Sequence, residues 1–93
     1  MSLDILEIVK QYKASFKHGI VNVEISARIV KTLDGTFYFE TSQLFKELGA
    51  AEFYTPGASS SDMEQAEQKL FNYLNKFKYV VIHGGITSGN SYF

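Results

Sequence analysis

The side chains that could do chemistry are few and scattered along the chain. Neither of the two histidines, His18 and His83, has a second histidine or a carboxylate at metal-ligand spacing within its own element. Three acidic residues, Asp62, Glu64 and Glu67, cluster at an expected helix start, where the helix dipole already favours anions. The chain has no cysteine, which excludes disulfides, thiolate ligands and a cysteine nucleophile. We therefore expect no catalytic residue, no metal site and no cofactor.

A glycine-rich run near the end of the chain, residues 84–90, has the composition of a phosphate-binding loop. Such loops bind phosphate because a helix that follows them points its N-terminal amides at the anion. Only three residues follow Asn90, and no Gly-Lys-Ser/Thr sequence occurs. A turn and an irregular tail over about residues 86–93 are the expected structures.

Three lysines, Lys10, Lys13 and Lys17, recur at spacings of three and four residues, which would place them on one face of a helix. Together with Tyr12 and Tyr38 they offer charge and stacking for a single-stranded nucleic acid. The formal net charge of −1 gives no long-range attraction to phosphates. A solvated helix face is the simpler interpretation, so nucleic-acid binding ranks third among the functions.

The chain is rich in aromatic residues, with eight Phe and six Tyr. Several fall outside the expected core, and exposed rings are enriched at partner surfaces because they bury much area at low entropic cost. With one charged neighbour they form the candidate partner-binding set: Phe53, Tyr54, Tyr38, Arg28 and Tyr92. The alternative is that the loop carrying Phe53 and Tyr54 folds back and its rings close the core.

Length and composition predict a single small domain over residues 1–93. Apolar residues make up 45% of the 93 residues and charged residues 20%, as in ordinary globular proteins. The first residues lack the basic region and long apolar run of a signal peptide, and no apolar run is long enough to span a bilayer. We expect a cytoplasmic protein with no membrane partner.

The first part of the chain predicts a helix followed by a strand. Apolar residues recur at helical spacing up to Phe16, and Gly19 is placed to end a helix in a left-handed conformation. Residues 20–30 then alternate between apolar and polar, which is typical of a half-buried strand.

A hairpin follows, and its register is predicted by the pleat. A three-residue loop, Leu33-Asp34-Gly35, sets Ile29 opposite Phe39 and Arg28 opposite Glu40, whereas a two-residue loop would mix apolar and charged residues on one face. The first strand then extends beyond its partner over residues 20–26, and we expect the last strand of the chain to pair there.

The remaining sequence predicts two helices and a strand. A short helix over 42–48 is followed by a mobile loop at about 50–61, and Ser61 with Glu64 forms a capping box for a longer helix. Residues 78–83 read as a buried strand, and a small final strand is allowed after Gly84-Gly85. The predicted fold is α+β, in the order α-β-β-α-α-β, with an antiparallel sheet of three to four strands and helices on one face.

The function that these features favour is a small non-enzymatic interaction or regulatory module. It would bind another protein, or a second copy of itself as a homodimer, through exposed aromatic rings and a sheet edge. The alternative is a small-ligand-binding domain with a pocket between helices and sheet, lined by Tyr12, Tyr38, Tyr73 or Tyr79.

Overall fold

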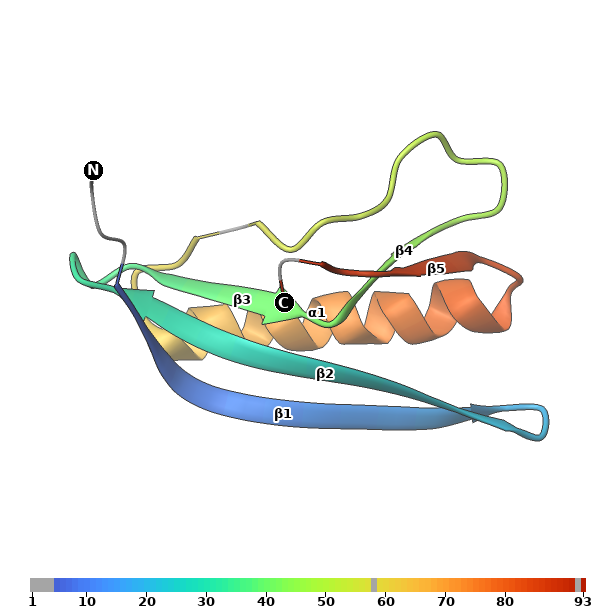
Figure 1. Cartoon of the computed structure of the whole chain (residues 1–93), viewed down its shortest axis with the longest axis horizontal. Helices are drawn as coiled ribbons and strands as arrows, with labels where there is room; N and C mark the ends of the chain where they lie inside the picture. Colours follow the sequence, from blue (N-terminus) through green and yellow to red (C-terminus); the bar gives the residue numbers. More distant parts are fainter. Residues whose placement is uncertain (1–4, 58, 92) are drawn as a thin grey trace.

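The chain begins with a long antiparallel hairpin of two strands, β1 (Leu6–His18) and β2 (Val21–Thr32). The structure is a computed structural model and describes residues 5–57, 59–91 and 93 (Figure 1). The predicted first helix is therefore wrong. Spacing of Tyr12 and Phe16 fits a helix, but Tyr12, Ala14 and Phe16 also alternate, and pairing with β2 decides in favour of the strand.

The turn of this hairpin contains only Gly19 and Ile20, because His18 pairs with Val21. Gly19 has a φ of 65°, the left-handed conformation expected at the first position of a type II′ turn. Gly19, predicted to end a helix, therefore lies in a tight turn between two strands instead. The prediction that the last strand pairs with residues 20–26 is also wrong, because that strand (Ile86–Gly89) pairs with residues 43–46 instead.

The second hairpin has the predicted register. β3 (Phe37–Thr41) pairs with β2 so that Ile29 lies opposite Phe39 and Arg28 opposite Glu40. Gly35, with a φ of 89°, closes the loop that follows Thr32. The three strands form one sheet in the order β1-β2-β3.

A second, two-stranded sheet replaces the predicted short helix and part of the predicted irregular tail. β4 (Gln43–Lys46) and β5 (Ile86–Gly89) pair antiparallel, with Phe45 opposite Thr87. Gly84-Gly85 turns the chain from the helix into β5. The pairing partner of β4 lies some forty residues away in sequence, so local spacing could not reveal it.

The only helix of the described residues, α1 (Met63–Ile82), is longer than predicted. Its N-cap is Asp62, whose side chain accepts from the Gln65 backbone N–H at 2.8 Å, rather than the predicted Ser61. The predicted strand at 78–83 is wrong, because Val80 continues the apolar stripe of Leu70 and Phe77 for another turn.

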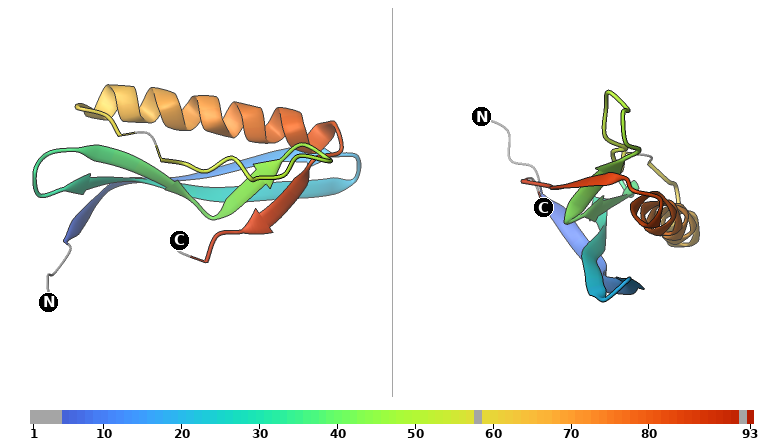
Figure 2. Two further views of the ribbon diagram at one scale, coloured as in Figure 1. Left: turned by 90° about the horizontal axis from the view of Figure 1, so that it is seen from above. Right: turned by 90° about the vertical axis from the view of Figure 1, so that its right-hand side faces the viewer.

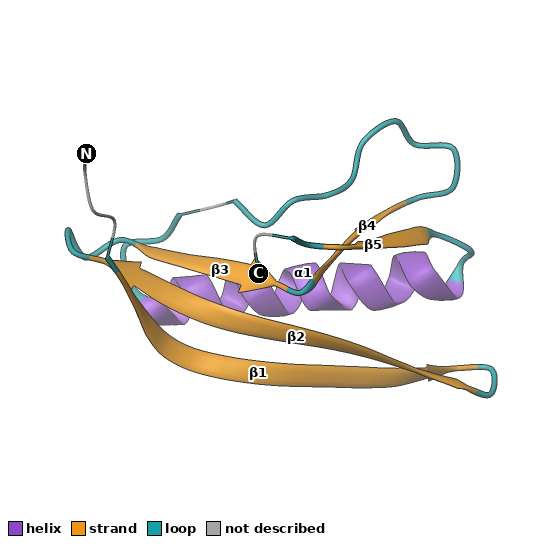
Figure 3. Cartoon of the chain, in the orientation of Figure 1, coloured by secondary structure: helices purple, strands orange, loops and turns teal. Residues whose placement is uncertain are grey.

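The helix packs along one face of the three-stranded sheet, and the β4–β5 sheet lies beside its second half (Figures 2 and 3). Two buried clusters fill the interface. The first contains Ala27, Ile29, Phe39, Ala66 and Leu70, and the second contains Ile25, Phe45, Phe77 and Val80. The fold is therefore a small compact α+β structure in the order β-β-β-β-α-β, with one helix on one face of the sheet.

Candidate functional site

The outer edge of β1 is a long strand edge that no other strand of the described residues covers. β1 has thirteen residues and lies at one end of the sheet order, where among the described residues it pairs with β2 alone. In Figure 1 it forms the lower boundary of the molecule along most of its length. An edge strand presents unpaired N–H and C=O groups to whatever lies beside it.

The other long edge of this sheet is partly covered by the chain itself. Phe37 of β3 exchanges two backbone hydrogen bonds of 2.9 Å with Ser60. In the smaller sheet, Tyr54 covers β4 in the same way, donating its backbone N–H to the Phe45 carbonyl at 2.8 Å. The loop over 50–61 thus follows two strand edges, and β1 keeps the longest open one of the described residues.

A groove runs beside this edge, between β1 and α1. It has a volume of about 380 Å³ and is lined by Tyr12, Lys13, Ala14, Phe71, Leu74 and Asn75. The Phe71 side chain is 39% exposed, and its ring meets that of Tyr12 edge-on at 5.6 Å between centroids. Two aromatic rings, Ala14 and Leu74 thus give the groove a largely apolar lining next to the strand edge.

The three lysines of β1 do not share a face, contrary to the prediction for a helix. Lys10 lies on the helix side of the sheet with Tyr12, whereas Lys13 and Lys17 alternate with these residues and lie on the opposite face. Lys13 approaches Glu24 at 3.8 Å. Nucleic-acid binding by Lys10, Lys13 and Lys17 stays a prediction, but not one based on a single helical stripe.

Tyr12, Lys10 and Glu67 join β1 to the helix by a polar contact. The Tyr12 hydroxyl donates to the Glu67 carboxylate, and the Lys10 ammonium lies 3.2 Å from the same oxygen. The hydrogen bonds from Tyr12 and Lys10 lower the pKa of Glu67, whose carboxylate in turn raises the pKa of Lys10. Burial is the main cause of the raised pKa of Tyr12.

Glu67→Gln is expected to weaken the acid dependence of stability. Because the pKa of Glu67 lies below its ordinary value of 4.5, its charge contributes stability above that value, and the contribution is lost as the pH falls through the lowered pKa. Urea unfolding from neutral pH to about pH 3 measures this difference. Glu64→Gln makes the same change on the same helix as a control. A Glu67→Gln profile parallel to that of the wild type would contradict the prediction.

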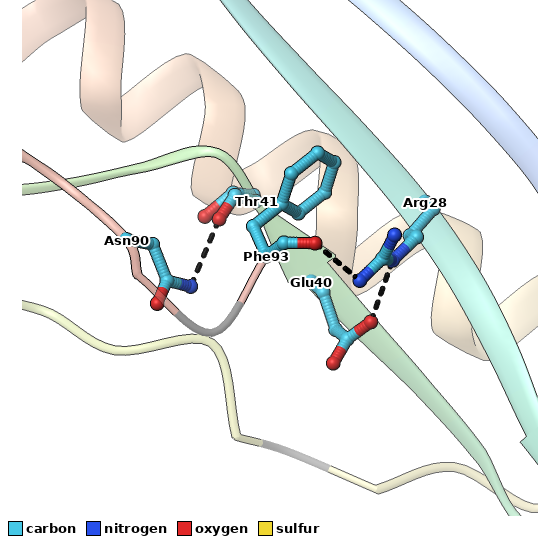
Figure 4. Close-up of polar contacts among 5 residues, drawn as sticks. All are labelled: Arg28, Glu40, Thr41, Asn90 and Phe93. Carbon is cyan, nitrogen blue, oxygen red and sulfur yellow. Dashed lines mark hydrogen bonds and ion pairs between the residues drawn. The ribbon is translucent and has the colours of Figure 1, made fainter. Parts of the chain in front are cut away.

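Arg28, a predicted partner-binding residue, is held in a contact within the chain (Figure 4). Its guanidinium donates to Glu40 at 2.7 Å and to the Phe93 carbonyl at 2.8 Å, and it lies 4.3 Å from the centre of the Phe93 ring. The Asn90 amide donates to the Thr41 carbonyl at 3.0 Å nearby. These contacts fix the end of the chain on the sheet face opposite α1.

The predicted loop aromatics are also engaged inside the fold. The Tyr54 ring packs on Phe45 at 5.1 Å and its backbone carbonyl accepts from the Tyr73 hydroxyl at 2.8 Å. Phe53 is half-buried, with the Lys46 ammonium 4.9 Å from its ring centre. Tyr38 is half-buried opposite Val30. Tyr92 lies outside the described residues, and the partner-binding role of the whole set stays a prediction.

The four tyrosines suggested for a ligand pocket do not lie around one site, and the small-ligand function stays a prediction. Tyr12 and Tyr73 both pack against the core under α1, but Tyr38 lies on the other face of the sheet. Tyr79 is 62% exposed and stacks on His83, with 4.2 Å between ring centroids. Within residues 5–57, 59–91 and 93, no three metal-ligating side chains lie close enough to hold an ion. No helix of that range is long and apolar enough to cross a membrane.

The sequence does not predict the edge and its groove, because the apolar residues of β1 also recur at helical spacing. The signal that could have found them is the pair Gly19-Ile20 between two alternating segments, a typical two-residue hairpin connection. Comparison with known proteins finds no family model, no curated protein and no solved structure that matches this chain. Function must therefore be argued from the geometry alone.

Proposed function

We propose that this chain is a non-enzymatic protein-interaction module that takes up an extended segment of another protein as an additional strand at the free edge of β1. The observation that carries the proposal is the long open edge itself. Strand addition gains main-chain hydrogen bonds along the whole contact, and side-chain pockets beside the edge supply selectivity.

Pairing within the chain at the edges of β3 and β4 supports β1 as the edge that binds a partner. Ser60 pairs with β3 and Tyr54 with β4, so two edges that would otherwise compete for an added strand are partly filled from within. Phe53, Tyr54 and Arg28 already have contacts in the fold. In this proposal they support the structure, and the partner binds at the free edge of β1.

The apolar residues at the start of β1 also support an interaction surface. Leu6, Ile8 and Val9 of β1, together with Ile5 just before the strand, are each between 40% and 51% exposed, and Glu7 lies between Leu6 and Ile8. The register shifts between Ile8 and Lys10, so a β-bulge lies within this segment. Exposed apolar side chains gathered on one short segment are typical of surfaces that another molecule covers.

Amide hydrogen exchange of the full chain tests the proposal. In the free protein, alternate β1 amides should exchange fast because they point away from β2. Extended peptides selected from a displayed library should bind and slow the exchange of these amides. The amides of Ala27–Lys31 in β2, held between β1 and β3, are the internal control and should not change. Protection confined to α1 or to the loop over 50–61, or no binding peptide at all, would refute the proposal.

A further inference from the structure

Resting on the proposed function, we infer that the partner segment alternates large apolar side chains with acidic ones. The apolar side chains enter the groove between β1 and α1, and the acidic side chains lie beside Lys13 and Lys17 on the other face of the sheet. The two faces of the β1 edge differ in chemistry, and this difference selects the pattern.

The groove accounts for the apolar half of the pattern. Side chains of an added strand would alternate between the two faces of the sheet, with those on the helix side next to Tyr12 and Ala14. There they would meet Phe71 and Leu74 across a groove of about 380 Å³. Phe71 is 39% exposed, and an apolar side chain in the groove would cover its ring and that of Tyr12.

The opposite face accounts for the acidic half. Lys13 and Lys17 lie on this face, and β1 carries no acidic residue from Ile8 to His18. The Lys13 side chain is 69% exposed, and its partner Glu24 is 53% exposed at 3.8 Å. An ion pair so open to water holds its partners weakly. An acidic side chain on an added strand could therefore pair with Lys13 at little cost.

A second copy of the chain that pairs over the whole lysine-bearing segment, residues 10–18 of both strands, fits this edge less well. Antiparallel pairing of two copies about Ala14 would set Lys10 opposite His18 and Lys17 opposite Gln11. No acidic side chain would lie opposite any lysine in this segment, and positive charge from both copies would accumulate on one ladder. The same positive charge attracts an acidic segment, so charge favours an acidic partner over a homodimer in this register.

Synthetic peptides test the pattern on the full chain. One probe alternates leucine with glutamate, a second alternates leucine with lysine, and a third has the composition of the first with its leucines contiguous. Fluorescence anisotropy measures affinity at low and high salt. We expect the glutamate probe to bind roughly tenfold more tightly than either control, since each exposed ion pair adds little. Part of this preference should be lost at high salt.

Two matched pairs of variants locate the contacts. Lys13→Glu should weaken binding of the glutamate probe and strengthen binding of the lysine probe. Lys78→Glu, the same change at an exposed position of α1, should alter the affinity for neither probe. Asn75→Trp should fill the groove and block all alternating probes. Asn72→Trp, one turn away on the same helix and outside the groove, should leave binding unchanged. All four positions are exposed, so these variants should fold.

The outcomes separate this inference from the proposed function. Peptides that protect β1 amides without regard to charge or alternation would overturn the inference and leave the function standing. A dimer that forms through β1 and excludes the probes would overturn the inference in favour of a second copy. Absence of β1 protection with every probe and with the selected peptides would overturn both.

Discussion

Phe45→Ala is expected to lower the free energy of unfolding by about 3–5 kcal/mol, the range found when a large buried ring is removed. Phe45 has 0% exposure and is the point where β4 meets the core. Its ring lies 4.9 Å from that of Tyr73, 5.1 Å from Tyr54 and 5.7 Å from Phe77. The variant would leave a cavity that these three rings line, and it would remove the edge-to-face contacts with Tyr73 and Phe77 and the tilted contact with Tyr54.

Urea unfolding followed by circular dichroism measures the effect, and for a chain of this size a loss of 3 kcal/mol should lower Tm by more than about 10 °C. Phe53→Ala is the matched control, because the same side chain is removed from a half-exposed position in the neighbouring loop. It should cost less than about 1 kcal/mol. A Phe45→Ala loss as small as that of Phe53→Ala would show that β4 is not held by this cluster.

The parts of the fold that the sequence predicts well are those in which one short-range rule decides. In the β2–β3 hairpin, only one loop length keeps Ile29 with Phe39 and Arg28 with Glu40, and the structure has that register. The middle of α1 is predicted for a similar reason. Ala66, Leu70 and Phe77 lie on one helical face, and all three are buried.

The errors occur where two periods fit the same residues and a distant partner chooses between them. Tyr12 and Phe16 are four residues apart, a spacing that suits a helix and a strand alike. β2 decides for the strand by pairing along β1, and β5 decides likewise for β4. At Val80, the opposite occurs: a β-branched run suggests a strand, but packing beneath β4 keeps it helical.

The candidate site follows from the first of these errors. A strand edge has no sequence motif, because it consists of backbone groups whose exposure depends on which strands lie beside it. A helix in place of β1 would have neither this edge nor the groove that Phe71 and Leu74 form with β1. The residues that the sequence suggests for partner binding, such as Arg28 and Tyr54, stand out by charge or ring type. Contacts from distant parts of the chain engage them inside the fold.

Gly85→Ala is expected to destabilise the junction between α1 and β5 by about 1–3 kcal/mol, as overpacking of a closed site typically does. A Cβ at this position would lie 2.2 Å from Val80 Cγ1, 2.7 Å from the Val80 carbonyl oxygen and 2.8 Å from the Lys46 carbonyl oxygen. Two of these atoms belong to the backbone, so rotation of a side chain cannot relieve the clash. The helix end and β4 would have to move apart.

Gly89→Ala, at the other end of β5, provides the matched control, since a Cβ there would meet no atom within 4 Å. The control should be neutral or slightly stabilising, because alanine restricts the unfolded chain more than glycine does. Unfolding in urea and amide exchange of β4 and β5 measure the contrast. Peptide binding at β1 should be unchanged in Gly85→Ala below its unfolding temperature, because β1 pairs with β2 rather than with β4 or β5. Equal stabilities of the two variants would mean that α1 and β4 do not approach Gly85 as closely as these distances require.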